Sequence, residues 1–173
     1  MTPVRLLVII RLLLAALLVA GLALTVWPVP IAGAAAISVT TTADENNNDG
    51  DCSLREAIIA ANEDRTVDAC PLGNGADTID LPAGDYALSI VGINETTART
   101  GDLNITDDVT ITGASRLSTT IDARGIDRVS YIYGPIDVHS SDVKITGGDS
   151  QGFVGGGIYL STAVGGYRTE QRR

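Results

Sequence analysis

Basic residues are scarce in this chain of 173 residues, and Lys144 is its only lysine. Lysine and arginine together number 12 against 21 acidic residues, so the formal net charge is −9. Binding to nucleic acid requires a basic surface, because contacts to phosphate supply much of the affinity. The charge balance therefore argues against nucleic acid as a partner.

Cysteine and histidine are also rare. The chain has two cysteines, Cys52 and Cys70, and its only histidine, His139, lies far from both in the sequence. Two cysteines without a nearby histidine are a poor metal site. In an exported protein such a pair predicts a disulfide, which would stabilise the fold by roughly 3 kcal/mol for a loop of this size. Two free thiols are the alternative.

The N-terminal segment lacks acidic residues entirely, since the first one is Asp44. Arg5 and Arg11 supply positive charge, and residues 12–27 contain no charged side chain. A positive segment followed by an apolar one is typical of a secretory signal peptide. The chain is therefore expected to be exported.

Small residues follow the apolar segment, and Ala34 with Ala36 fits the pattern that signal peptidase cleaves. We predict a signal peptide over residues 1–36, whose removal leaves 10 basic and 21 acidic residues and a net charge of −11. An uncleaved membrane anchor is the alternative, because residues 6–26 span about 20 positions and could just cross a bilayer. Arg11 interrupts that stretch.

The 137 residues after Ala36 suffice for one domain. They are rich in Gly, Asp, Thr and Ile, a composition that favours strands joined by tight turns. One helix is predicted, beginning with a capping box in which the Ser53 hydroxyl accepts from the Glu56 amide and the Glu56 carboxylate reaches back to the Ser53 amide. Apolar residues at steps of three and four continue through Asn62 and give this helix one buried face.

Short segments with alternating apolar and polar residues indicate strands along the rest of the chain. Residues 37–42 form the first, and the acidic run 44–51 after it is a predicted loop. The further predicted strands are residues 78–81, 86–90, 103–106, 109–112, 120–123, 129–133, 136–139, 143–146 and 158–160.

An internal repeat relates residues 101–113 to residues 134–147, some 33 to 34 positions later. A repeat of two or three short strands with polar corners fits one coil of a β-solenoid. We therefore predict a mainly β fold, a right-handed parallel β-helix, with the helix over residues 53–62 covering the open first coil. Antiparallel hairpins are the alternative, and they predict two-residue Asn-Gly or Asp-Gly turns, which are scarce here.

Residues 52–58, with the sequence CSLREAI, resemble the signature of the CSLREA domain, an N-terminal module of secreted bacterial parallel β-helix proteins of the pectate-lyase-like superfamily. The resemblance covers about residues 37–90, and residues 155–159 look like a coil motif of the same proteins. It implies the fold and the extracellular compartment, and it supplies no catalytic residues. Members of the family continue for many more coils, so a short, truncated β-helix is expected here.

The loop before the helix has spacing similar to that of a calcium-binding loop. Oxygen ligands fall at Glu45, Asn47 and Asp49, Gly50 stands at the sharp turn, and Glu56 occupies the last position. Glu replaces the usual Asp at the first position, and Glu56 is already required by the capping box. A solvated acidic loop leading into a helix is the alternative, and no other cofactor is predicted.

Paired acids at Asp107 with Asp108 and at Asp137 with Asp142 could serve acid and base catalysis. Asp also suits turns, and Asp108 and Asp142 precede predicted strands at equivalent repeat positions. Arg55 and Lys144 are the only basic residues near these motifs, and arginine is a poor general base because it stays protonated. We therefore predict no catalytic residues, and we expect Arg55 to pair with an acid near the helix.

The predicted organisation is a signal peptide (1–36), an N-terminal cap with the first strands (37–98), β-helix coils (99–160) and a disordered or truncated tail (161–173). The leading hypothesis is a secreted or cell-surface protein of structural or adhesin type that binds an extracellular polysaccharide or another surface component. A fragment of an extracellular polysaccharide lyase or hydrolase is the alternative. Contact with a membrane is expected only through an uncleaved leader.

Overall fold

The computed structural model describes residues 33–93, 95–153 and 155–161, together with the backbone of residues 167–170. All but the last four residues of the predicted signal peptide, and the whole of the alternative membrane anchor, lie outside this part. The described residues form one compact unit. In the part of the chain that is described, no helix has the length and apolar character needed to cross a membrane.

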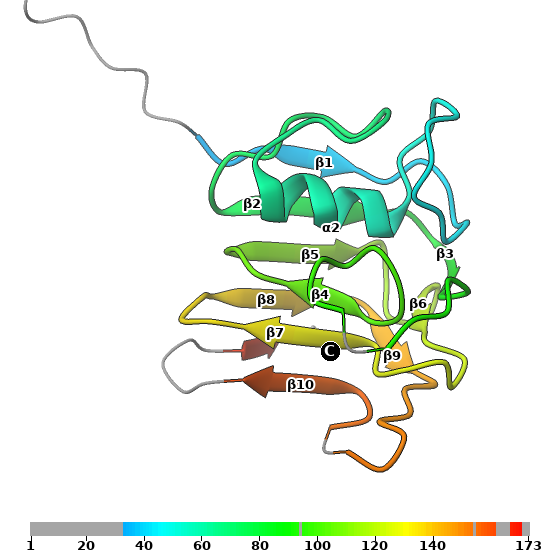
Figure 1. Ribbon diagram of the computed structural model, residues 1–173. Helices are drawn as coiled ribbons and strands as arrows, with labels where there is room; N and C mark the ends of the chain where they lie inside the picture. The colour runs from blue at the N-terminus through cyan, green and yellow to red at the C-terminus, as the bar shows by residue number, and fades with distance from the viewer. Residues whose placement is uncertain (1–32, 94, 154, 162–166, 171–173) are drawn as a thin grey trace, which may run out of the picture. The chain divides into compact units, whose positions relative to one another are not determined.

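The described strands form three sheets and one helix packs beside them (Figure 1). Sheet 1 consists of β1 (Ala36–Ser38), β2 (Asp77–Leu81), β5 (Val109–Gly113), β8 (Val138–Ser141) and β11 (Tyr167–Glu170). Sheet 2 consists of β4 (Leu103–Ile105), β7 (Ser130–Tyr133) and β10 (Ile158–Ser161). Sheet 3 consists of β3 (Gly84–Ala87), β6 (Thr119–Asp122) and β9 (Lys144–Thr146).

The chain visits the three sheets in rotation. From β2 onward it runs from sheet 1 to sheet 3 to sheet 2 and back, so that each strand pairs with the one three positions later. Every pairing between these strands is parallel, which rules out the antiparallel hairpins for this part of the chain. The fold is therefore mainly β, with parallel sheets and one helix.

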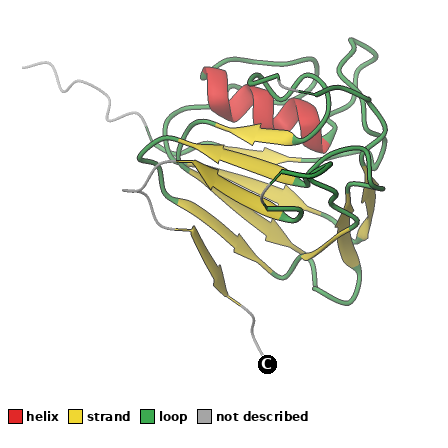
Figure 2. Ribbon diagram, turned by 60° about the horizontal axis from the view of Figure 1, so that its bottom comes forward, coloured by secondary structure: helices red, strands yellow, loops and turns green. Residues whose placement is uncertain are grey.

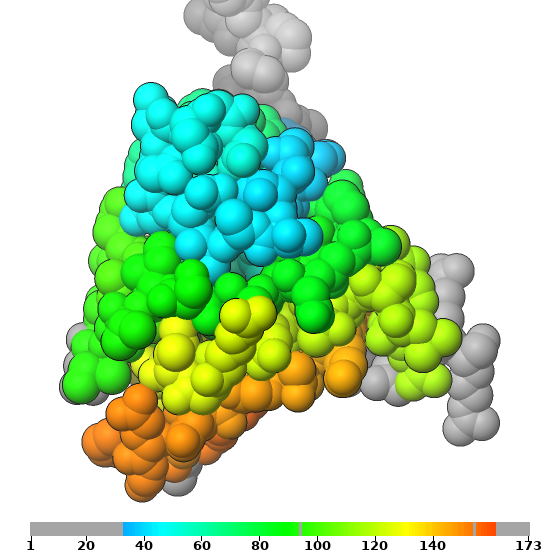
Figure 3. All heavy atoms as spheres, turned by 90° about the vertical axis from the view of Figure 1, so that its right-hand side faces the viewer, coloured from blue at the N-terminus to red at the C-terminus, as the bar shows by residue number. Residues whose placement is uncertain are grey.

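Successive passes of the chain lie as successive layers. In the space-filling view the residue colours change in order from one end of the described part to the other (Figure 3). The strands of neighbouring passes lie side by side in Figure 2. In sheet 1, Ile79 stands opposite Ile111, and Val109 stands opposite Val138, so that like side chains stack along the direction of the layers.

Alternation of side chains along the strands builds the core. In β2, Ile79 and Leu81 are buried while Asp80 between them is exposed, and β5 repeats the pattern with Val109 and Ile111 buried. These residues join the inward side chains of the other sheets in one hydrophobic cluster. Burying each side chain of this size stabilises the fold by about 1.5 to 3 kcal/mol relative to leaving it exposed.

The helix α2 (Leu54–Glu63) covers one end of the layers, where it packs on β2 and β4 (Figures 1 and 2). The predicted capping box is confirmed, because Ser53 and Glu56 make both reciprocal hydrogen bonds. At the other end Asp64 adopts a left-handed conformation, and its N–H donates to the carbonyls of Ala60 and Ala61, which terminates the helix.

The offset predicted for the internal repeat does not match the strand pairing. Val109 stands opposite Val138, which is 29 positions later, whereas the residue 34 positions later, Val143, immediately precedes β9 in sheet 3. Similar strand sequences suit any inward-facing position, so they do not specify which sheet a strand joins. The number of residues in each corner decides which sheet the next strand joins, and this number differs from pass to pass.

A second difference concerns the tail predicted to be disordered or truncated over residues 161–173. Ser161 ends β10, and residues 167–170 form β11, which pairs in parallel with β8, so these residues lie in strands instead of a disordered segment. Truncation of the chain stays a prediction. The edge of β8 presents unpaired backbone groups that a further strand can satisfy. Residues 162–166 and 171–173 lie outside the described part.

Candidate functional site

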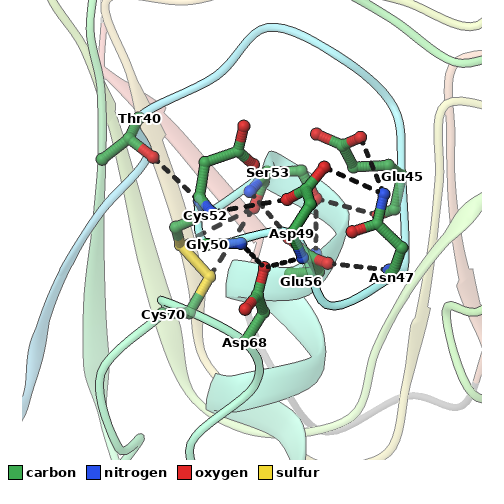
Figure 4. Close-up of a disulfide and its surroundings, with 11 residues drawn as sticks. Thr40, Glu45, Asn47, Asp49, Gly50, Cys52, Ser53, Glu56, Asp68 and Cys70 are labelled. Atoms are coloured by element: carbon green, nitrogen blue, oxygen red, sulfur yellow. Dashed lines mark hydrogen bonds between the residues drawn. A yellow bond between two sulfur atoms is a disulfide. The ribbon is translucent and has the colours of Figure 1, made fainter.

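The predicted disulfide is present and ties together the two chain segments that flank α2 (Figure 4). Cys52 precedes the helix, Cys70 follows it, and both are buried. The amide of Cys52 donates to the hydroxyl of Thr40 at 2.8 Å, which connects the disulfide to the segment after β1. The cross-link therefore holds both flanks of the helix against the first layer of strands.

A buried ion pair anchors the same helix from its other side. Arg55 is fully buried, and its Nε and Nη2 donate to the two carboxylate oxygens of Asp44 at 2.6 and 3.1 Å. The guanidinium also donates to the carbonyls of Ala98 and Gly101. The expectation that Arg55 pairs with an acid near the helix is confirmed, and its role is structural.

The acidic loop before the helix brings three carboxylates together. Oxygens of Glu45, Asp49 and Asp51 lie within 4.8 Å of one another, and the side-chain amide of Asn47 donates to Glu45 and Asp49 (Figure 4). Burial and the neighbouring carboxylates raise the pKa of Glu45. Among the described residues, Oδ1 of Asp51 is a buried side-chain oxygen without a hydrogen-bond partner. The backbone amides of Asp49 and Gly50 donate to Oδ2 of Asp68.

This arrangement differs from the ligand set Glu45, Asn47, Asp49 and Glu56 predicted for calcium. Both carboxylate oxygens of Glu56 already accept backbone amides, one from Asn47 and one from Ser53. The third carboxylate beside those of Glu45 and Asp49 belongs to Asp51, which the calcium-loop spacing does not select. Calcium binding at this loop stays a prediction, and the residues that approach one another for it are Glu45, Asp49 and Asp51.

The acids singled out as paired have structural contacts. Oδ1 of Asp108 accepts the backbone amide of Asp137 at 2.7 Å, which links the corner before β5 to the corner before β8. The Asp108 amide in turn donates to Asp107. Asp142 adopts a left-handed backbone conformation next to β8, as turn residues do. The interpretation of these residues as turn formers therefore agrees with their contacts.

Sheet 2 carries three tyrosines and one arginine on its outer side. We call this group the tyrosine face: Tyr131, Tyr133, Tyr159 and Arg128. Tyr131 of β7 stands opposite Tyr159 of β10, and their stacked rings have centroids 5.3 Å apart. The ring of Tyr133, on the same side of β7, lies 6.2 Å from that of Tyr131. The guanidinium of Arg128 lies over Tyr131 and Tyr159, at 5.8 and 5.3 Å from the ring centroids.

The tyrosine face exists because residues alternate along a strand. In β7 the side chains of Ser130 and Ile132 are buried, so Tyr131 and Tyr133 point outward, and Tyr133 is 56% exposed. Parallel pairing without a register shift then places Tyr159 beside Tyr131. Asn104 of β4 continues the column on the other side of Tyr131.

Three carboxylates lie next to this face, and we call Glu95, Asp102 and Asp127 the carboxylate cluster. Nη1 of Arg128 lies 3.6 Å from Asp102 and 3.8 Å from Asp127. The side-chain amide of Asn104 donates to both Glu95 and Asp102, at 3.0 and 3.1 Å. Asp102 and Asp127 are buried, so the cluster combines several charges at the edge of the core.

Burial, with the negative charge of Asp127, raises the pKa of Asp102 to about 6, and the nearby Arg128 opposes this effect only in part. For Glu95 burial also acts upward, but hydrogen bonds from the Thr97 hydroxyl and from backbone amides outweigh it, so its pKa is lowered. Two neighbouring carboxyl groups thus have pKa values shifted in opposite directions, a feature frequent at functional sites.

A pocket of about 100 Å³ opens beside the cluster. It is lined by Ile93, Asp127, Arg128, Ser150, Gln151 and Phe153. Asp127 and Arg128 therefore belong both to the pocket and to the group around the tyrosines. The pocket, the carboxylate cluster and the tyrosine face together form the candidate site.

The sequence predicts no such convergence. Asp102, Asp127 and Arg128 come from corners of successive passes, 25 or 26 positions apart, and no motif links them. The available signal is the alternation in residues 130–133, which marks Tyr131 and Tyr133 as outward-facing once the core side is known. The partner of Tyr131 depends on strand register, which the repeat offset misplaces. Comparisons with known protein families, curated proteins and solved structures find no match for this chain.

Proposed function

We propose that this chain is an extracellular parallel β-helix protein of binding type, and that its tyrosine face binds polysaccharide. The rotation of strands through three parallel sheets supports the first part, because this is how a solenoid chain winds. The disulfide supports an exported protein, since such cross-links persist in oxidising compartments. The similarity to the CSLREA domain is consistent with both and stays a prediction.

The observation that carries the binding proposal is the column of tyrosines beside buried carboxylates. A pyranose ring presents a face of C–H groups that packs on an aromatic ring, and its hydroxyls donate to carboxylate oxygens. Ligand sites commonly combine aromatic surface with a few polar groups that set orientation. Tyr131 and Tyr159 lie on neighbouring strands and Tyr133 extends the face along β7, so the surface is extended, which suits a polymer better than a single small molecule.

Binding of oligosaccharides to the purified protein tests the proposal. Isothermal titration with cellotetraose and with chitin and chitosan tetramers is compared between the unaltered protein and the double variant Tyr131→Ala and Tyr159→Ala. We expect the double variant to lose at least about tenfold in affinity, which corresponds to 1.4 kcal/mol. Leu117→Ala removes an apolar side chain that is 90% exposed in the corner between β5 of sheet 1 and β6 of sheet 3, and it serves as the matched control. Equal affinities of the double variant and the control would contradict the proposal.

Hydrolysis of the bound polysaccharide is a second candidate function, favoured by the raised pKa of Asp102. A carboxyl group that keeps its proton near pH 6 can act as a general acid, and Asp127 beside it can accept a proton. Release of reducing ends from the same oligosaccharides measures this activity. The substitution Asp102→Asn is expected to abolish it while leaving stacking on the tyrosines in place, and an unchanged rate would exclude Asp102 as the acid.

A further inference from the structure

The pocket beside the tyrosine face differs in character from the face itself. Its walls come from the segment around Ile93, from the corner at Asp127 and Arg128, and from residues 150–153. The wall at 150–153 is held in place, because the side-chain amide of Gln151 donates to the carbonyl of Ile126 at 2.9 Å. The backbone amide of Asp149 likewise donates to the carbonyl of Asp127. These bonds fix the wall at residues 150–153 against the corner that carries Asp127 and Arg128.

The size of the pocket limits what can enter it. Its volume of about 100 Å³ is well below the roughly 300 to 1,000 Å³ of pockets that enclose a drug-sized ligand. A substituent of a sugar ring therefore suits the pocket better than a whole ring. A sugar stacked on Tyr159 or Tyr131 would have to direct such a substituent past Arg128.

The charge around the pocket favours a cation. Asp102 and Asp127 lie near the guanidinium of Arg128, and Glu95 shares the side-chain amide of Asn104 with Asp102. The acidic groups therefore outnumber the basic group here, and the negative charge of the chain as a whole acts in the same direction. Anionic substituents are disfavoured, and a protonated amine would gain attraction from Asp127 at the pocket wall.

We propose that this pocket binds the protonated amino group of an amino sugar, so that the preferred ligand is a polymer containing unacetylated hexosamine. The inference rests on the proposed function, since the tyrosine face must hold the sugar rings. The rings supply the packing surface and the pocket supplies discrimination between sugars. Ser150 at the wall offers a further oxygen to the amine, and the exposed side chains of Phe153 and Ile93 exclude water from its rim.

The experiment compares three tetramers that differ in the substituent at one ring position: glucosamine, N-acetylglucosamine and glucose. Titrations are made below the pKa of the sugar amine and at low salt. We expect the glucosamine tetramer to bind at least about tenfold more tightly than the glucose tetramer, and the preference to shrink as salt screens the charges. Equal affinities for all three tetramers overturn the amine proposal but leave polysaccharide binding intact. Absence of binding by all three overturns both proposals.

Two variants test whether the pocket causes the preference for the glucosamine tetramer. Asp127→Asn removes a carboxylate from the wall, and Gln151→Lys adds a positive charge at an exposed position of its rim. Each is expected to lower affinity for the glucosamine tetramer by at least about fivefold more than affinity for the glucose tetramer. Asp85→Asn, an exposed change of the same charge on sheet 3, is the control. A preference that survives both pocket variants overturns the assignment.

Discussion

The cap around α2 and the tyrosine face of sheet 2 are held together in different ways. Around the helix, a disulfide, a capping box and a buried ion pair join residues that lie within about one helix length in the sequence or in the adjoining loops. The tyrosine face joins residues of separate passes through parallel register, ring stacking and the contacts of Arg128. The covalent cross-link therefore lies in the region that closes the first layer, and the proposed binding surface lies on the later layers and is held by non-covalent contacts.

This difference predicts that changes in the cap affect stability and changes in the face affect binding. The largest effect is expected for Arg55→Met, which removes the arginine partner of the buried Asp44 carboxylate, whose other hydrogen bonds among the described residues come from the backbone amides of Ser89 and Ile90. Losing one member of a buried pair costs about 3 to 5 kcal/mol in the free energy of unfolding. Urea unfolding measures the change. Arg65→Met is the control, because its partner Glu63 is exposed and such pairs contribute about 0 to 1 kcal/mol. Equal losses in both variants would contradict the role of Arg55.

The second largest effect is expected when the disulfide is removed by substituting both Cys52 and Cys70 with Ser. For a closed loop of 18 residues the expected loss is about 3 kcal/mol in the free energy of unfolding. Reduction of the unaltered protein should give the same loss, and affinity for oligosaccharides should not change while the protein remains folded. A loss of oligosaccharide binding without a loss of stability would contradict the prediction that the cap affects only stability.

A smaller effect is expected from the pH dependence of Asp102. Its pKa is raised from the ordinary value of 3.8 to about 6 in the folded protein, so the folded state holds the proton more tightly than the unfolded state. Its contribution to stability is therefore present at low pH and is lost as the pH rises from about 4 to about 6. Asp102→Asn removes this loss.

Unfolding at pH values on either side of that range measures the effect. Relative to the unaltered protein, the variant should gain on the order of 1 kcal/mol in the free energy of unfolding between acid and neutral pH. This gain is smaller than the full shift implies because solvent screens the charge. Asp85→Asn corrects for the general loss of a carboxylate. A stability difference that does not vary with pH would contradict the raised pKa.

The smallest effect concerns the acidic loop of the cap. If the calcium prediction holds, about 2 mM calcium should raise the free energy of unfolding by about 0.6 kcal/mol for a dissociation constant near 1 mM. Asp51→Asn should abolish the increase, because Asp51 joins Glu45 and Asp49 in the loop. Thermal melting with and without calcium measures it. An unchanged midpoint would leave the segment as a solvated acidic loop before the helix.

Prediction from the sequence succeeds for the cap for a physical reason. The helix and the hydrogen bonds between Ser53 and Glu56 depend on neighbouring residues. The disulfide pairing follows because the chain has two cysteines. The positions of most strands are also predicted within two residues, because alternation is local. The boundary of β8 is shifted by two residues, from a predicted 136–139 to Val138–Ser141.

The candidate site is predicted poorly, again for a physical reason. Asp102 and Asp127 look like ordinary corner residues, and Asp108 and Asp142, which appear equivalent in the repeat, lie before strands of different sheets. Asp51 is missed at the acidic loop because ligand spacing selects Glu56, whose oxygens the backbone already occupies. In each case the deciding contact lies outside the motif.

The sequence by itself determined the elements of this protein: a capped helix between two cysteines, many short strands with one apolar side, and an acidic chain that disfavours nucleic acid. These follow from local hydrogen bonding, side-chain alternation and net charge. Only the tertiary structure decided which sheet each strand joins, and thereby which side chains meet. Corner lengths set that register, and register stacks Tyr131 on Tyr159 and brings Asp102 and Asp127 to one arginine.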